Sequence, residues 1–436
     1  MKGFVSSHRF YRPAPKLAFR AVTLVAAVAM PLFSIGSLAD VQAKTTITWA
    51  VVAGANYEAR YNQTVAAFEK VHPDIEVKWI PIVVGVSSDF QQKILTMAAA
   101  GEPPDVIRID VENLPQYVRL GLLDDLGPYL AKDPSYAKSL ETSVFPAARA
   151  AFNYEGKQWG IPLTVTVSST YYNADLLDQA GLNPPTDQWT WDDMVAMAKR
   201  MTKDRNGDGK PDQFGLQQTT DYVEWLPLMY SYGGEIIDAQ HRIVFNSPAN
   251  VKAFQMYQSW QQKEHISPRD GEGQNVGFDQ GNVGFIMMAD WVRQVYQHIT
   301  KFRWDVASIP AGPKDQVAFI GGGAMGVSAA SKHKEAAWEF VKFATSDAVQ
   351  GIMVANRAGI PVVQRIAAEQ YVGSRPLPAH QLTILKMLQI ARSAPADVRW
   401  ERMLAIFRKN LPGLLGGDTS ATEFVTKTAD ELSALR

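Results

Sequence analysis

The clearest absence in this sequence is cysteine, of which its 436 residues contain none. Without cysteine the chain forms no disulfide, offers no thiol nucleophile and cannot carry the lipidated cysteine of a bacterial lipoprotein. The seven histidines are scattered, with no H-E-x-x-H motif and no pair at i, i+4, so no helical zinc site is indicated. Neither a G-x-S-x-G nucleophile motif nor a G-x-x-x-x-G-K-[ST] phosphate loop is present. A glycosidase pair of carboxylates is defined by distance in space, so an exported carbohydrate-active enzyme stays open.

Acidic residues are missing from the first 39 positions, which carry five basic residues. The apolar run AVTLVAAVAMPLFSI follows at 21–35, and the small residues Ser37 and Ala39 stand where a signal peptidase reads. The run is short for a membrane span and contains Pro31. We therefore expect residues 1–39 to be a signal peptide, cleaved after Ala39 or Ala43. The mature protein would be periplasmic and free of a lipid anchor.

Clustered positive charge is also missing from the rest of the chain. Removal of residues 1–39 leaves 38 basic against 44 acidic residues, a net charge of −6. Such a chain offers nothing to nucleic acid or to an anionic bilayer. A length of 436 residues is more than one core usually fills, so two lobes are expected.

Strand and helix patterns alternate from residue 45 onward. Apolar periodicity predicts strands at 46–52, 75–80 and 105–109, with helices at 57–71 and 90–100 between them. This order indicates a mostly parallel sheet covered by helices, in which ligands bind beyond the carboxyl ends of strands, here 53–56 and 110–113. A long extended run at 160–173 leads into a second α/β unit. In it we expect helices at 191–201, 222–230, 248–263 and 291–299, extended segments at 303–310 and 318–326, a helix at 333–345, and helical structure from about 381.

Gly321, Gly323 and Gly326 spell G-x-G-x-x-G, the dinucleotide-binding pattern. In that motif a helix begins at the last glycine, whereas here Val327 and its neighbours continue an extended segment. The pattern therefore does not indicate a nicotinamide or flavin enzyme.

The loop DRNGDGKPD matches the first nine positions of a calcium-binding loop, with glycine sixth. Its oxygen ligands would come from Asp204, Asn206, Asp208, Lys210 (through its carbonyl) and Asp212. Position 12 is Gly215 in place of the usual bidentate glutamate. The alternative is an acid-rich turn whose side chains cap their own backbone. No other cofactor is expected.

Aromatic residues are plentiful, with 11 Trp and 15 Tyr. Several stand at the edges of expected loops, where an aromatic face can pack on a sugar ring while neighbouring polar groups bind its hydroxyls. For any single aromatic residue the core is the commoner place. The group as a whole favours a ligand-binding cleft. Its members are Tyr57, Tyr222, Trp225, Trp291 and Trp400.

The mature chain resembles the extracellular solute-binding proteins of ABC importers, in the branch of maltose-binding protein and related oligosaccharide binders. The segments that carry the resemblance are FEKVHPDIEVKW (68–79), AAAGEPPDVIRID (98–110), GLLDDLGPYL (121–130), YYNADLLDQAGLNPPTDQWTWDDMVAMAKRM (171–201), NGDGKPDQFG (206–215), FDQGNVGFIMMADWV (278–292) and EAAWEFVKFATSD (335–347).

The resemblance implies an α/β fold of two lobes joined by three crossovers, near 164–167, 317–321 and 357–362. The lobes would comprise 40–164 with 320–357, and 165–319 with 358–436. It places the Gly321–Gly322 run at the hinge side of the cleft. The ligand-contacting candidates are Asn56, Asp110, Asn113 and Thr166 on the first lobe and hinge, and Tyr222, Trp225, Trp291 and Trp400 on the second, together with Gly321 and Gly322.

The implied function is capture of a sugar or oligosaccharide for a membrane permease, by a monomer without catalysis of its own. The same fold could instead bind a polyol or a glycerol phosphoester. For a phosphate, Arg293 or Arg357 would be the expected partner.

Overall fold

The computed structural model describes residues 44–83, 87–269, 272, 276–372 and 379–435. The expected signal peptide at 1–39 lies outside this part of the chain. Within the described ranges, no helix is both long and apolar enough to span a membrane. The described residues form one compact unit.

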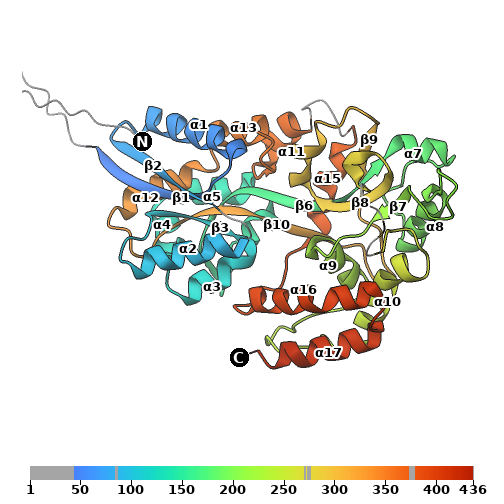
Figure 1. Ribbon diagram of the computed structural model, residues 1–436. Coiled ribbons are helices and arrows are strands. Elements are labelled where there is room, and N and C mark those ends of the chain that lie inside the picture. Colours follow the sequence, from blue (N-terminus) through green and yellow to red (C-terminus); the bar gives the residue numbers. More distant parts are fainter. Residues whose placement is uncertain (1–43, 84–86, 270–271, 273–275, 373–378, 436) are drawn as a thin grey trace, which may run out of the picture. The chain divides into compact units, whose positions relative to one another are not determined.

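The first part of the fold follows the predicted alternation of strands and helices (Figure 1). Helix α1 ends at Val71, before His72 and Pro73, because proline restricts the preceding residue to extended backbone. Short helices that the sequence pattern did not reveal then lead to a small hairpin. The elements are β1 (Thr45–Val52), α1 (Ala55–Val71), β2 (Ile75–Ile82), α2 (Ser87–Ala99), β3 (Val106–Asp110), η1 (Val111–Asn113), α3 (Leu114–Arg119), α4 (Gly127–Lys132), α5 (Pro134–Ser143), α6 (Pro146–Ala150), β4 (Asn153–Tyr154) and β5 (Lys157–Gln158).

The middle of the chain carries strong helix-start signals. Thr190 forms a capping box with Asp193, and Asp221 and Ser247 cap the next two long helices by accepting backbone N–H bonds. The elements are β6 (Ile161–Asn173), α7 (Ala174–Gln179), α8 (Trp191–Met201), β7 (Phe214–Gln217), α9 (Tyr222–Ser231), α10 (Pro248–Gln262), η2 (Phe278–Gln280), β8 (Val283–Ala289), η3 (Asp290–Val292), α11 (Arg293–Tyr296), β9 (Trp304–Ala307) and β10 (Ala318–Val327).

The last part of the chain is mainly helical, as expected. Its elements are α12 (Lys334–Phe343), α13 (Asp347–Ala355), β11 (Ile360–Pro361), α14 (Gln364–Ile366), η4 (Ala367–Tyr371), α15 (Gln381–Met387), η5 (Leu388–Ile390), β12 (Ala391–Arg392), α16 (Trp400–Gly416) and α17 (Ala421–Ser433). One predicted helix is shorter than expected: the 291–299 segment is a 3₁₀ turn followed by the four residues of α11.

The sheet is mixed, which corrects the prediction of a mostly parallel one. Its strand order is β2-β1-β3-β10-β6-β8-β7. Strands β1, β2 and β3 pair in parallel, but β10 is antiparallel to both β3 and β6, and β8 is antiparallel to β6. The βαβ pattern holds only where a helix returns the chain between neighbouring strands. The later strands enter the sheet from distant parts of the sequence, so local patterning could not give their direction.

Strand β6 (Ile161–Asn173) is long enough to pair with different strands along its two halves (Figure 1). The first half of β6 pairs with β10, and its second half pairs with β8 and β9. At Val165 the strand lies between Gly322 of β10 and Ile360 of β11. The three segments expected to cross between lobes are therefore neighbours in one sheet.

Candidate functional site

A cavity of about 410 Å³ lies where the ends of β3 and the middles of β6 and β10 approach helices α9 and α16. Its wall combines charged, aromatic and glycine residues, the composition expected of a site for a polar ligand. The lining residues are Tyr57, Arg60, Arg108, Asp110, Glu112, Asn113, Thr164, Thr166, Asp221, Tyr222, Trp291, Gln294, Gly321, Gly322, Gly323, Ala358, Glu401, Leu404 and Arg408.

The glycine run of β10 forms the floor of the cavity, and each glycine has a separate steric reason. Gly322 has φ +147°, and a Cβ there would lie 2.5 Å from the carbonyl oxygen of Thr164. A Cβ on Gly321 would come within 3.3 Å of a Glu112 carboxylate oxygen, and one on Gly323 within 3.3 Å of the Arg108 guanidinium. The absence of side chains at these glycines therefore lets Glu112 and Arg108 approach the backbone of β10 closely. Strand β10 continues through Gly326 to Val327, so no helix begins there.

Two arginines, Arg60 and Arg108, lie at one end of the cavity, where its wall comes from the first part of the chain. Arg108 donates from Nε and Nη2 to Asp110 Oδ1, at 3.1 and 2.7 Å. Arg60, only 7% exposed, lies 4.3 Å above the Tyr57 ring and 5.1 Å from the Tyr61 ring. Aromatic faces attract a guanidinium because the ring face carries negative charge.

Glu112 connects this end to α9. Tyr222 Oη donates to Glu112 Oε1 at 3.2 Å. Burial, and after it the charge of Asp110, raises the pKa of Glu112 to about 7. At neutral pH this carboxyl group is therefore a mixture of the ionised form, which only accepts hydrogen bonds, and the protonated form, which also donates one.

Two buried polar atoms of cavity-lining residues have no hydrogen-bond partner within the described part of the chain. They are Asn113 Oδ1 and Thr166 Oγ1. Buried polar atoms without partners are uncommon in folded proteins and cost free energy. A ligand with several hydroxyl groups would satisfy both.

Trp291 is the most accessible aromatic residue at the cavity, with 37% of its surface exposed. It sits in η3 between two buried residues, Asp290 and Val292. Asp290 accepts a hydrogen bond from Tyr371 Oη at 3.3 Å, and the Arg293 guanidinium lies 4.5 Å above the Tyr371 ring. These contacts hold the turn in place and leave the indole ring at the cavity wall.

Seven of the ten predicted ligand-binding residues line this single cavity. They are Asp110, Asn113, Thr166, Tyr222, Trp291, Gly321 and Gly322. Asn56 lies in the first turn of α1, but its side chain is outside the described part of the structure. That these seven residues and Asn56 contact a ligand remains a prediction.

Two of the ten predicted residues, Trp225 and Trp400, do not line this cavity. Trp225 is fully buried, with its ring centroid 4.5 Å from that of Phe407. Trp400 is 1% exposed and lies behind Tyr222, with centroids 5.7 Å apart. Both stand in the first turn of a helix, and both rings pack into the core. The cavity receives their neighbours on the same helices, Tyr222 and Glu401.

The sequence analysis missed six charged residues of the cavity: Arg60, Arg108, Glu112, Asp221, Glu401 and Arg408. A usable signal was the alternation of Arg108, Asp110 and Glu112 at the end of a buried strand, which places them on one face. The expected phosphate partner Arg293 is instead buried, and its Nη2 donates to Gln381 Oε1 at 3.0 Å.

The calcium-like loop turns its oxygens onto its own backbone. Asp204 accepts from the N–H groups of Gly207 and Gly209 at 2.7 and 2.8 Å, and Asp208 accepts from Lys210 N–H at 2.9 Å. Among the described residues, no group of three or more His, Cys, Asp or Glu side chains is arranged to hold a metal. Calcium binding stays a prediction, and the self-capped turn accounts for these contacts without it.

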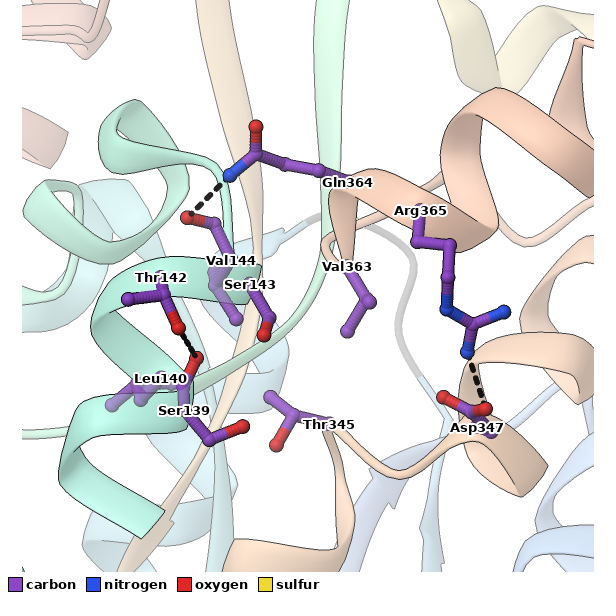
Figure 2. Close-up of a pocket in the computed structure, with 10 residues that line it drawn as sticks. All are labelled: Ser139, Leu140, Thr142, Ser143, Val144, Thr345, Asp347, Val363, Gln364 and Arg365. Carbon is purple, nitrogen blue, oxygen red and sulfur yellow. Dashed lines mark hydrogen bonds and ion pairs between the residues drawn. The ribbon is translucent and has the colours of Figure 1, made fainter. Parts of the chain in front are cut away.

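Two other hollows fit a ligand less well. One, of about 420 Å³, lies between α5 and the α13–α14 region. Figure 2 shows that Arg365, the one cation among its described lining residues, is already engaged by Asp347 in an ion pair. A larger hollow of about 740 Å³ contains Ile320, the neighbour of the glycine run. In this hollow Arg392 Nη1 and Nη2 each donate a hydrogen bond to one carboxylate oxygen of Glu235, at 3.0 Å, so the guanidinium is already engaged.

Comparison with known proteins places the chain in a family. Residues 54–351 match the model for bacterial extracellular solute-binding proteins. The chain belongs to that family. A binding protein of Brucella abortus is 28% identical over 81% of this chain and 84% of its own length. An arabinooligosaccharide-binding protein of Bacillus subtilis is 27% identical over 66% of each chain.

A solved structure agrees with the fold. An ABC substrate-binding protein of Listeria monocytogenes in complex with cycloalternan superposes with a TM-score of 0.79 at 26% identity, covering 89% of this chain and 98% of its own. The predicted two-lobed α/β fold is confirmed by this match. The family and its structural neighbours are binding proteins.

Proposed function

We propose that this protein is the periplasmic substrate-binding subunit of an ABC importer and that it captures a sugar or oligosaccharide in the 410 Å³ cavity. The observation that carries the proposal is one cavity that combines the exposed face of Trp291 with buried, unpartnered Asn113 Oδ1 and Thr166 Oγ1. An indole face packs on the C–H face of a sugar ring, and the buried oxygens bind its hydroxyls.

The lobe boundaries support closure around the ligand. The proposed first lobe (40–164 and 320–357) contributes Asp110 and Asn113, and the proposed second lobe (165–319 and 358–436) contributes Tyr222 and Trp291. A ligand that touches both lobes binds the closed state better than the open one, which is the condition for ligand-driven closure.

The proposed function also requires export of the protein and delivery of its ligand to a membrane permease. Residues 1–39 act as a cleaved signal, and the mature chain works as a monomer that passes ligand to membrane permease subunits. It performs no catalysis on the ligand. Incubation of the purified protein with a bound oligosaccharide should return that compound unchanged, whereas accumulation of shorter products would identify an enzyme.

A thermal-shift screen over neutral mono- and oligosaccharides, acidic sugars, polyols and phosphoesters tests the function. A ligand that binds only the folded state raises the melting temperature. We expect at least one sugar to do so, and isothermal titration should then give a single site per chain. A response confined to compounds without a sugar ring, or none at all, would contradict the proposal.

A further inference from the structure

Arg60 stands out among the cavity residues because it is buried and has no acidic partner in the part of the chain that the structure describes. It lies in α1, contributes to the cavity wall and is 7% exposed. Buried arginines are normally paired with a carboxylate or bound by several acceptors, because leaving water costs a charged group several kcal/mol. Among the described residues, none forms an ion pair with Arg60.

The bonds that Arg60 does make leave most of its donors unused. Nη2 donates one hydrogen bond to Tyr61 Oη at 3.3 Å. The central carbon of the guanidinium lies over the rings of Tyr57 and Tyr61, 4.3 and 5.1 Å from their centroids. A guanidinium has five N–H donors in one plane, so the aromatic contacts fix its orientation and leave the other donors for a further partner.

The nearby carboxylate is already engaged. Asp110 Oδ1 is bound by Arg108 through two N–H groups. Glu112 is bound by Tyr222 and is partly protonated at neutral pH because burial raises its pKa to about 7. With Arg60 and Arg108 against Asp110, this end of the cavity carries a surplus of positive charge.

The opposite wall carries the opposite charge. Asp221 and Glu401 line the cavity there, with Arg408 as the cation among them. The cavity is therefore polarised, positive toward α1 and β3 and negative toward α9 and α16. A neutral ligand is bound here only through hydrogen bonds to the charged groups, whereas a ligand with an anionic group at one end is also oriented by the charge distribution.

We propose that Arg60 is the recognition point for an anionic group on the ligand, so that the cavity takes an acidic saccharide, carrying a carboxylate or a phosphate. This inference rests on the proposed function and narrows its substrate class. The guanidinium fork offers two parallel N–H bonds to either group. The sugar ring then extends toward Trp291, and its hydroxyls meet Thr166 and Asn113.

The test compares matched charged and neutral probes by isothermal titration calorimetry on the full mature chain. The pairs are digalacturonate against galactobiose, glucuronate against glucose, and glycerol 3-phosphate against glycerol. We expect an acidic member to bind at least ~10-fold more tightly than its neutral counterpart, because a hydrogen-bonded charge contributes more than a neutral hydroxyl. Comparison of the first two pairs with the third separates carboxylate from phosphate.

Variants assign the preference to Arg60. Arg60→Gln should remove the preference for the acidic probe, because it lowers the affinity for that probe at least ~10-fold more than the affinity for the neutral probe. Arg60→Lys keeps the charge without the fork and should retain part of the preference. Arg242→Gln is the matched control, since Arg242 is exposed, pairs with Asp238 and does not line the cavity. Melting curves establish that each variant is folded, and Arg60→Lys carries the test if Arg60→Gln does not fold.

The outcomes separate this inference from the proposed function. Tighter binding of neutral sugars than of acidic ones would overturn the inference and leave sugar binding standing. An equal loss of neutral and acidic affinity in Arg60→Gln would also overturn it, because Arg60 would then bind hydroxyls. Binding of glycerol 3-phosphate with no sugar bound would support the anionic subsite and contradict the sugar proposal.

Discussion

At the scale of single residues, the same residue type serves different purposes according to where its side chain points. Trp291 is 37% exposed at the cavity, whereas Trp225 is fully buried beside Phe254 and Phe407. Both stand near the start of a helical segment in the sequence. Only the packing of the folded chain separates them.

This difference predicts opposite effects of truncation. Trp291→Ala should reduce sugar affinity by ~30-fold or more, as expected for a binding hot spot of about 2–4 kcal/mol, and leave the ligand-free melting temperature nearly unchanged. Trp225→Ala should instead lower the free energy of unfolding by roughly 3–5 kcal/mol through the cavity it leaves. Calorimetric titration and urea melts of both variants provide the comparison. Wild-type affinity in Trp291→Ala would remove this residue from the site.

Glu224 is a second residue whose environment sets its behaviour. It is fully buried, and it accepts hydrogen bonds from the N–H and Oγ1 of Thr219 at 2.6 and 2.5 Å. Burial raises its pKa to about 8. The folded protein therefore holds a proton that the unfolded chain, with a carboxyl pKa near 4.5, releases.

The sign of the pH effect follows from this difference. The stabilising contribution of protonated Glu224 is fully present below pH 4.5 and is lost as the pH rises toward 8. Urea melts should therefore show a free energy of unfolding lower at pH 8 than at pH 5, by on the order of 2 kcal/mol. Glu224→Gln should reduce this slope and leave the part that Glu112 contributes through its own raised pKa, whereas Glu58→Gln, on the exposed face of α1, should leave the slope unchanged. An unchanged slope in Glu224→Gln would assign the dependence to other groups.

At the scale of elements, strand β10 is shaped by its glycines. Gly322 lies between β6 and β3 with φ +147°, a backbone conformation that other residues rarely adopt. Gly351, in contrast, is inside helix α13, and a Cβ there would meet its nearest atom at an ordinary 3.7 Å.

The two glycines should respond oppositely to alanine. Gly322→Ala should destabilise the protein by about 1–3 kcal/mol or more, through backbone strain and the approach to the Thr164 carbonyl, and weaken ligand binding. Gly351→Ala should stabilise it by roughly 0.5–1 kcal/mol, because alanine favours helix. Thermal melts of both variants test this. Equal melting temperatures would show that β10 adjusts without strain.

The loop at 204–212 is the second element with a testable role. Calcium binding predicts that a chelator lowers the melting temperature, that calcium restores it, and that Asp208→Ala abolishes both effects. The hydrogen bonds of Asp204 and Asp208 to the loop's own N–H groups are compatible with a preformed site and with a metal-free turn. A melt that is insensitive to chelator in the wild-type protein would leave only the turn.

At the scale of the whole molecule, export should define the working chain. Cells that express the full sequence should release a mature protein that begins at Asp40 or Lys44 and carries no lipid, as judged by N-terminal sequencing and intact mass of the periplasmic fraction. Removal of residues 1–39 with their five basic residues also changes the net charge from −1 to −6. Recovery of the uncleaved chain from membranes would contradict this prediction.

The sequence by itself determined the local elements of the fold. Helix α8 was predicted with its observed bounds, because its capping residues and apolar period are local signals. It also indicated the cavity residues that stand at strand ends, such as Asp110 and Asn113, because strands of a parallel layer present their carboxyl ends together. The family resemblance supplied the two-lobed arrangement and the place of the glycine run.

The tertiary structure alone decided which distant segments meet. The antiparallel insertion of β10 between β3 and β6 brings Glu112 to Tyr222, 110 residues away, and this contact leaves no periodic trace in the chain. It also decided that Arg60 lies buried beside an occupied carboxylate, and that Trp225 and Trp400 turn inward. Burial and charge pairing depend on what packs against a side chain from elsewhere in the fold, and local sequence patterns carry no information about those neighbours.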